Sequence, residues 1–213
     1  MIGAVVWDMG GVFSRYFTEV LLDAGSQRGW PIDRIPLGPN GPVPDPDYVR
    51  MTEGLIEESA YLEVVRGRLA AEGIRFDPLR DIDWPNQQRP ETWEAIKKIH
   101  ASSLVQMILT NDASKWMGER WWEKWEPIRY FDALIDVATL GVRKPHPNTY
   151  LAAAEALSMA TEVCIFIDDM VVNCRGAEAV GMQSHLFSIT KPEASIALLL
   201  ERIGLREAHP PVG

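Results

Sequence analysis

Residues 5–12 read VVWDMGGV, a stretch in which an apolar, β-branched run meets an aspartate and two glycines. The run that contains it, Ile2–Trp7, has the composition of a strand that is buried on both faces of a sheet. Asp8 then falls at the carboxyl end of that strand, and Gly10-Gly11 allow backbone amides to approach a ligand closely. An aspartate in this place can act as a covalent nucleophile, although aspartate also commonly caps a turn.

Four more apolar runs follow along the chain, and helical patterns separate them. The runs are Leu104–Leu109, Ala133–Val137, Val163–Ile167 and Gln183–Phe187, and the helical patterns are Pro90–His100, Pro147–Leu157 and Asn173–Val180. Gly181 follows the last pattern, as expected of a left-handed helix end. This alternation predicts βαβ units, and hence an α/β fold with a doubly wound, Rossmann-like parallel sheet.

Polar residues stand after the second and fourth runs, at the strand ends where open α/β sheets bind their ligands. Thr110 and Asn111 carry hydroxyl and amide groups that suit either phosphate oxygens or the cap of a helix. Asp168-Asp169 put two like charges after an apolar strand, which predicts a cation with oxygen ligands such as Mg²⁺. Lys144 stands in a loop stiffened by proline, where it either neutralises a phosphate or remains a solvated surface lysine.

Together these segments resemble the four sequence motifs of the haloacid dehalogenase-like hydrolases, in the same order and each after its own strand. The first motif corresponds to Val5–Val12, and the second ends in Thr110 followed by Asn. The third supplies the lysine of Arg143–Pro147, and the fourth is Ile167–Asp169 with Asn173 four residues on. The residues from 173 to 187 resemble the family's usual continuation, so the likeness covers nearly the whole chain.

The resemblance implies a phosphatase that acts on a small phosphorylated metabolite. Asp8 would attack phosphorus and form an aspartyl-phosphate. Thr110, Asn111 and Lys144 would hold the phosphoryl oxygens, and Lys144 would also count as a catalytic residue. The resemblance further implies a Mg²⁺ ion held by Asp8, by the backbone carbonyl of Gly10 and by Asp169, with Asp168 in support.

Gly10 departs from the family pattern, in which an aspartate at this position usually serves as general acid and base. Because acid/base catalysis contributes typically about 10²–10⁴-fold, its absence predicts better turnover of aryl than of alkyl phosphates and a slowly hydrolysed intermediate. The competing expectation is that another residue, Asp112 or a side chain of the inserted segment, supplies the proton.

Residues 14–89 do not follow the strand–helix alternation. They contain a helical pattern at Glu57–Glu72 and, between Pro31 and Pro46, six prolines that predict a loop outside the sheet. By resemblance this segment is the small helical cap of subfamily I, inserted after the first motif. The expected domains are therefore a catalytic core of residues 1–13 and 90–213 and a cap of residues 14–89.

Composition excludes several classes of partner. The 213 residues carry a net charge of −9 without a basic stripe, so we expect neither nucleic acid nor an anionic membrane as a partner. No apolar run is long enough to span a bilayer, and the N-terminal run lacks the flanks of a signal peptide. Two cysteines in different predicted elements suggest no disulfide framework. We expect a cytoplasmic monomer or homodimer.

Two other functions remain open from the sequence. A 2-haloacid dehalogenase also forms an aspartyl ester, but it needs no metal, so the Asp168-Asp169 pair argues against it. The second alternative is a catalytically weakened binding or regulatory protein that keeps the fold after losing the acid/base residue. The presence of Asp8, Thr110 and Lys144 together argues against this reading, because a scaffold does not need all of them.

Overall fold

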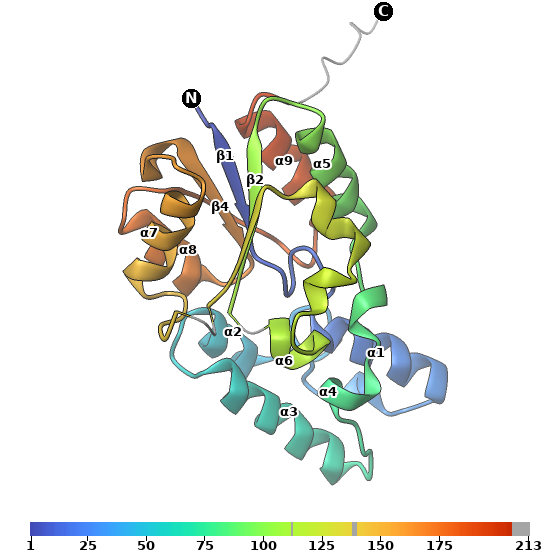
Figure 1. The fold of residues 1–213 in the computed structure, drawn as a ribbon. Helices are drawn as coiled ribbons and strands as arrows, with labels where there is room; N and C mark the ends of the chain where they lie inside the picture. Colours follow the sequence, from blue (N-terminus) through green and yellow to red (C-terminus); the bar gives the residue numbers. More distant parts are fainter. Residues whose placement is uncertain (112, 138–139, 206–213) are drawn as a thin grey trace, which may run out of the picture.

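The computed structural model describes residues 1–111, 113–137 and 140–205, so Asp112 lies outside the described residues (Figure 1). Strands of the described chain form a parallel sheet in the order β3-β2-β1-β4-β5. They are β1 (Ala4–Trp7), β2 (Val105–Thr110), β3 (Ala133–Asp136), β4 (Cys164–Asp168) and β5 (Gln183–Leu186). Each predicted strand is confirmed, with ends that shift by one or two residues.

The side chains of the central strands alternate between two hydrophobic clusters. Val5 and Trp7 of β1 belong to one cluster, whereas Ala4 and Val6 belong to the other. The first cluster includes buried residues of α5 (Pro90–His100) and α9 (Pro192–Arg202), and the second includes those of α7 (Pro147–Ala156) and α8 (Val171–Glu178). Helices therefore cover both faces (Figure 1), which explains why the central strands are mostly apolar on both faces and confirms the doubly wound α/β fold.

Local signals in the sequence set several helix ends. A proline occupies the first position of α5, α7 and α9, where its missing N–H would have no intrahelical partner. After α8, Gly181 adopts a φ of 89°, and the N–H of Met182 returns to the carbonyl of Ala177 at 3.1 Å. No helix among the described residues is long and apolar enough to cross a membrane.

The segment between β1 and α5 forms helices that lie beyond the carboxyl ends of the strands (Figure 1). They are α1 (Phe17–Arg28), α2 (Pro46–Thr52), α3 (Glu58–Ala71) and α4 (Pro78–Asp81), with short 3₁₀ turns at Ile32–Arg34 and Trp84–Asn86. The two connections to the sheet run side by side, because Arg15 N–H donates to the carbonyl of Gln87 at 2.7 Å and Arg89 N–H donates to that of Phe13 at 2.9 Å. The larger hydrophobic cluster continues from the sheet into these helices.

The proline-rich segment lies outside the sheet, as predicted, yet it is packed closely onto α3. Leu37 is fully buried in the larger cluster. Asp45 caps the N-terminus of α2 and also accepts hydrogen bonds from Gly38 N–H at 2.9 Å and from the Tyr61 hydroxyl at 2.7 Å. Arg68 of α3 pairs with the same carboxylate at 3.0 Å. This buried carboxylate therefore joins the segment to two helices.

Asp45→Ala should lower the free energy of unfolding by roughly 3 kcal/mol, because it leaves buried partners of the carboxylate unsatisfied. Burial alone would raise the pKa of Asp45, but hydrogen bonds from Tyr61, Gly38 and Arg68 hold this pKa below its ordinary value. The stabilisation is therefore present above the ordinary carboxyl pKa and is lost as the pH falls through the lowered value. Urea unfolding at several pH values measures both effects.

Glu72→Ala is the matched control, because Glu72 pairs with Arg34 at the surface. It should change the free energy of unfolding by less than about 1 kcal/mol. Equal losses for the two variants would contradict the central role of Asp45.

Candidate active site

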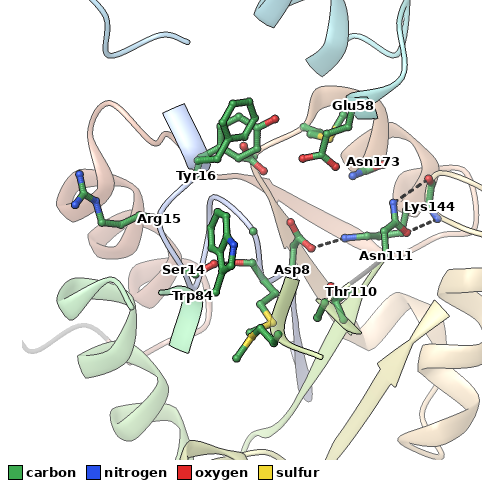
Figure 2. A pocket seen from close by; sticks show the side chains of 17 residues that line it. Asp8, Ser14, Arg15, Tyr16, Glu58, Trp84, Thr110, Asn111, Lys144 and Asn173 are labelled. Atoms are coloured by element: carbon green, nitrogen blue, oxygen red, sulfur yellow. Dashed lines mark hydrogen bonds and ion pairs between the residues drawn. The ribbon is translucent and has the colours of Figure 1, made fainter. Parts of the chain in front are cut away.

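Asp8 lies at the carboxyl end of β1, on the floor of a cavity between the sheet and the inserted helices (Figure 2). Its N–H donates to the carbonyl of Ile167 at 2.8 Å and so extends the ladder between β1 and β4. Because Trp7 pairs with Ile167, the same register brings Asp168 beside Asp8. Thr110 ends the neighbouring strand β2 and is buried at the wall of the same cavity.

Asp8, Asp168 and Asp169 come together at these strand ends, with one oxygen from each within 4.8 Å of the others. The carboxylate of Asp168 is occupied on both sides: it accepts from the N–H of Met170 at 2.8 Å and from Nδ2 of Asn173 at 3.0 and 3.1 Å. Asp169 differs, because its buried Oδ2 has no hydrogen-bond partner among the described residues. Asp168 is thus fixed by its neighbours, while Asp169 has an oxygen available for a ligand.

Lys144 neutralises part of this cluster. Its Nζ donates to Asp8 Oδ1 at 2.6 Å (Figure 2) and to Asp168 Oδ2 at 2.9 Å. Burial alone would lower the pKa of Lys144, but the charges of Asp168 and Asp8 hold it above its ordinary value, so the lysine stays charged. Lys144 is 3% exposed. It is therefore not a solvated surface lysine, which was the alternative that the sequence allowed.

Asn111 holds the main chain of Lys144 in place through two hydrogen bonds. The N–H of Lys144 donates to Asn111 Oδ1 at 2.9 Å, and Asn111 Nδ2 donates to the carbonyl of Lys144 at 3.3 Å. Both polar atoms of this amide contact Lys144, and the phosphate-binding role expected from the sequence stays a prediction. Its observed contacts therefore position the lysine.

Three acids against one lysine leave an excess of negative charge in a buried site. Burial raises the pKa of Asp8 to about 7, with Lys144 opposing the shift and Asp168 adding to it. Burial and the charges of Asp168 and Asp8 raise the pKa of Asp169 well above its ordinary value. A divalent cation bound here would favour the ionised forms of both carboxyl groups.

Gly11 makes the close approach of Asp169 possible. Its φ of 78° favours glycine, and a Cβ added there would come within 2.6 Å of Asp169 Oδ2. Gly10 is different, because a Cβ at this position would meet nothing within 4 Å. Gly10 lines the cavity and leaves open the space that a longer side chain would fill.

The residues present fit a hard divalent cation. Asp8 and Asp169 offer carboxylate oxygens, and Oδ2 of Asp169 has no hydrogen-bond partner among the residues that the structure describes. Oxygen donors with excess negative charge are what Mg²⁺ prefers. Asp168 supports this set through its contacts with Lys144 and Asn173. A ligand role for the Gly10 carbonyl remains a prediction.

Side chains of the inserted segment form the upper walls of the cavity (Figure 2). They are Tyr16, Phe17, Glu58 and Trp84. Sequence reasoning missed all of them, because they come from separate segments and their shared direction depends on tertiary packing. Arg15 also reaches the cavity but pairs with Asp23 at 2.7 Å and points away from Asp8 (Figure 2).

Comparison with known proteins identifies relatives that match most of the chain. A family model described as haloacid dehalogenase-like hydrolase matches residues 2–181. Phosphatase MT3486 of Mycobacterium tuberculosis (strain CDC 1551 / Oshkosh) is 27% identical over 191 residues, which cover 87% of each chain. Acyl-CoA dehydrogenase family member 10 of Mus musculus is 26% identical over 215 residues; the match covers 94% of this chain but only 19% of the mouse protein.

A solved structure with the same fold is L-2-haloacid dehalogenase from Xanthobacter autotrophicus with chloropropionic acid covalently bound. The two structures superpose with a TM-score of 0.56 at 22% sequence identity, over 99% of this chain and 91% of the dehalogenase. Because the family model spans most of the chain and the fold and strand-end motifs agree with it, this protein belongs to the haloacid dehalogenase-like hydrolases.

Proposed function

We propose that this hydrolase is a Mg²⁺-dependent phosphatase of a small phosphorylated metabolite. The observation that carries the proposal is the arrangement on the cavity floor. There Asp8 shares a buried site with charged Lys144 and with Asp169, one oxygen of which has no hydrogen-bond partner in the described part of the chain. The phosphatase from M. tuberculosis among the relatives supports it.

Asp8, Asp169 and the carbonyl of Gly10 would hold the metal, with Asp168 behind them. A bound Mg²⁺ would screen the negative charges of the carboxylate and the phosphoryl group from each other. It would also favour the ionised forms of Asp8 and Asp169, whose pKa values are raised chiefly by burial.

Asp8 would attack phosphorus through a carboxylate oxygen, forming an O–P bond as the bond to the leaving oxygen breaks. Lys144 would donate to a phosphoryl oxygen. Its hydrogen bonds with Asn111 would hold it in position while negative charge moves among the phosphoryl oxygens. The hydroxyl of Thr110 would donate to another. Water would then hydrolyse the aspartyl-phosphate and return Asp8 to its starting state.

We further propose that residues 14–89 act as the cap of this site and that residues 1–13 and 90–213 act as its catalytic core. The cap side chains Tyr16, Phe17 and Trp84 line the cavity with apolar surface. They would exclude water and accept the organic part of the substrate.

A screen with phosphate esters and a haloacid tests the proposal against its alternatives. Activity on 4-nitrophenyl phosphate that requires Mg²⁺ and disappears in Asp8→Asn is the expected result. Metal-independent release of chloride from 2-chloropropionate would instead identify a dehalogenase, as the likeness to the Xanthobacter enzyme would allow. Failure to turn over any phosphate ester or haloacid, with Mg²⁺ still bound, would favour a binding or regulatory role.

Asp169→Asn should stabilise the protein in the absence of Mg²⁺ and remove the stabilisation that Mg²⁺ gives. The raised pKa of Asp169, caused by burial and by the charges of Asp168 and Asp8, means that ionisation of this carboxyl group lowers the stability of the fold at neutral pH. Thermal unfolding with EDTA and with Mg²⁺ measures both effects.

Glu155→Gln is the control, because Glu155 is exposed on α7, away from the cavity. It should respond to Mg²⁺ as the wild type does. If Asp169→Asn unfolds at lower temperature than wild type in EDTA, then the carboxylate has a structural role and the metal assignment is wrong.

A further inference from the structure

Gly10 leaves the proposed phosphatase without the carboxylate that would normally transfer protons at this position. No described residue fills the gap locally, since a Cβ at Gly10 would meet none of their atoms within 4 Å. A replacement among these residues must therefore reach the reacting atoms from elsewhere on the cavity wall.

The cavity offers few groups that can give and take a proton. Among the described residues that line it, the carboxylates are Asp8, Glu58 and Asp169. Asp8 is the proposed nucleophile, and Asp169 belongs to the proposed metal set. Tyr16 donates its hydroxyl to Met51 Sδ at 3.2 Å, and burial raises its pKa well above the ordinary value, so it is a poor base. Glu58 is therefore the remaining carboxylate that could transfer protons.

Glu58 approaches the cavity from the side opposite to the nucleophile. It is the first residue of α3, and in Figure 2 its carboxylate points from the cap into the cavity, while Asp8 points up from the floor. In phosphoryl transfer the attacking and leaving oxygens lie roughly in line. A leaving oxygen displaced by Asp8 would therefore face the cap, where Glu58 lies.

The position of Glu58 is fixed by the rest of α3. Tyr61 and Arg68 of this helix both bind the buried carboxylate of Asp45, and Val65 and Leu69 pack into the larger hydrophobic cluster. A group on a helix that is anchored in this way has the fixed geometry that proton transfer requires.

We propose that Glu58 is the general acid and base of this enzyme, supplied by the cap in place of the residue missing at position 10. The inference rests on the proposed phosphatase function. As Asp8 forms its bond to phosphorus, the electron pair of the breaking P–O bond passes to the leaving oxygen, which takes the proton of the Glu58 carboxyl group. The Glu58 carboxylate then takes a proton from water as the water oxygen attacks phosphorus, and the Asp8–phosphorus bond breaks with its electrons returning to Asp8.

The test compares Glu58→Gln with wild type on 4-nitrophenyl phosphate and on an alkyl phosphate such as glycerol 3-phosphate, with Mg²⁺ present. For the alkyl ester, kcat/KM should fall by about 10²–10⁴-fold, because an alkoxide needs the proton. For the aryl ester, kcat/KM should change by less than about tenfold, because nitrophenolate leaves without one. Intact-protein mass spectrometry should show that phosphorylated Glu58→Gln accumulates during aryl ester turnover, because water is no longer activated.

Glu57→Gln is the matched control. Glu57 is adjacent, its side chain is 77% exposed, and it makes no hydrogen bond that caps α3. This variant should keep wild-type rates on both esters. In Glu58→Gln, the second substitution Gly10→Asp should restore part of the alkyl phosphatase rate, because the space at Gly10 is open.

Several results would overturn the proposal. An equal loss on both esters would make Glu58 a substrate-binding or structural residue, and a parallel loss of Mg²⁺ affinity would assign it to the metal site. A loss confined to the alkyl ester in Asp112→Asn, with Glu58→Gln unaffected, would give the role to Asp112. Wild-type activity on the aryl ester tests the phosphatase function separately, so its absence would reject that function and not only the role of Glu58.

Discussion

The site depends on one constraint: three carboxylates are buried together, and a single lysine lies beside them. Oxygens of Asp8, Asp168 and Asp169 lie within 4.8 Å of one another, and Lys144 contacts two of the three residues. Like charges at this distance are unfavourable away from water, as the raised pKa values of Asp8 and Asp169 express. The parallel sheet can hold them together because its strands are packed on both faces and end at one edge. In the proposed function, the free energy that this arrangement costs the free protein would be offset when a cation and a phosphoryl group bind.

A second buried ion pair connects this site to the inserted helices. Arg89 donates through Nε to the carbonyl of Gly11 at 3.0 Å and through Nη2 to the carboxylate of Glu19. The same carboxylate accepts from the N–H of Tyr16 at 2.8 Å. The loop that follows Asp8 and the helix that carries part of the cavity wall are thus joined through one guanidinium. The floor and the roof of the cavity are consequently positioned together.

The sheet and the floor of the site follow from short-range features of the sequence. An apolar run is a local feature of the sequence, and it is uninterrupted in a parallel strand that is buried on both faces. Asp8, Thr110 and Asp168 could therefore be assigned to strand ends, where they were expected to meet. The contact between Asn111 and Lys144 could not be predicted, because it joins two loops that are 33 residues apart in the chain. The direction of Glu58 into the cavity depends on how α3 packs on Asp45 and the hydrophobic cluster. The sequence around Glu58 is equally compatible with a solvated first turn of a helix.

The central claim is that Asp8 accepts a phosphoryl group beside a metal that is held by Asp169. A crystal structure of the protein with Mg²⁺ and beryllofluoride, which mimics a phosphoryl group on aspartate, tests it most directly. The account predicts beryllium bonded to a carboxylate oxygen of Asp8, Mg²⁺ in contact with Asp8 and Asp169, and Lys144 and Thr110 donating to the fluorides. Beryllofluoride that is absent from Asp8, or a Mg²⁺ ion bound without Asp169, would contradict it.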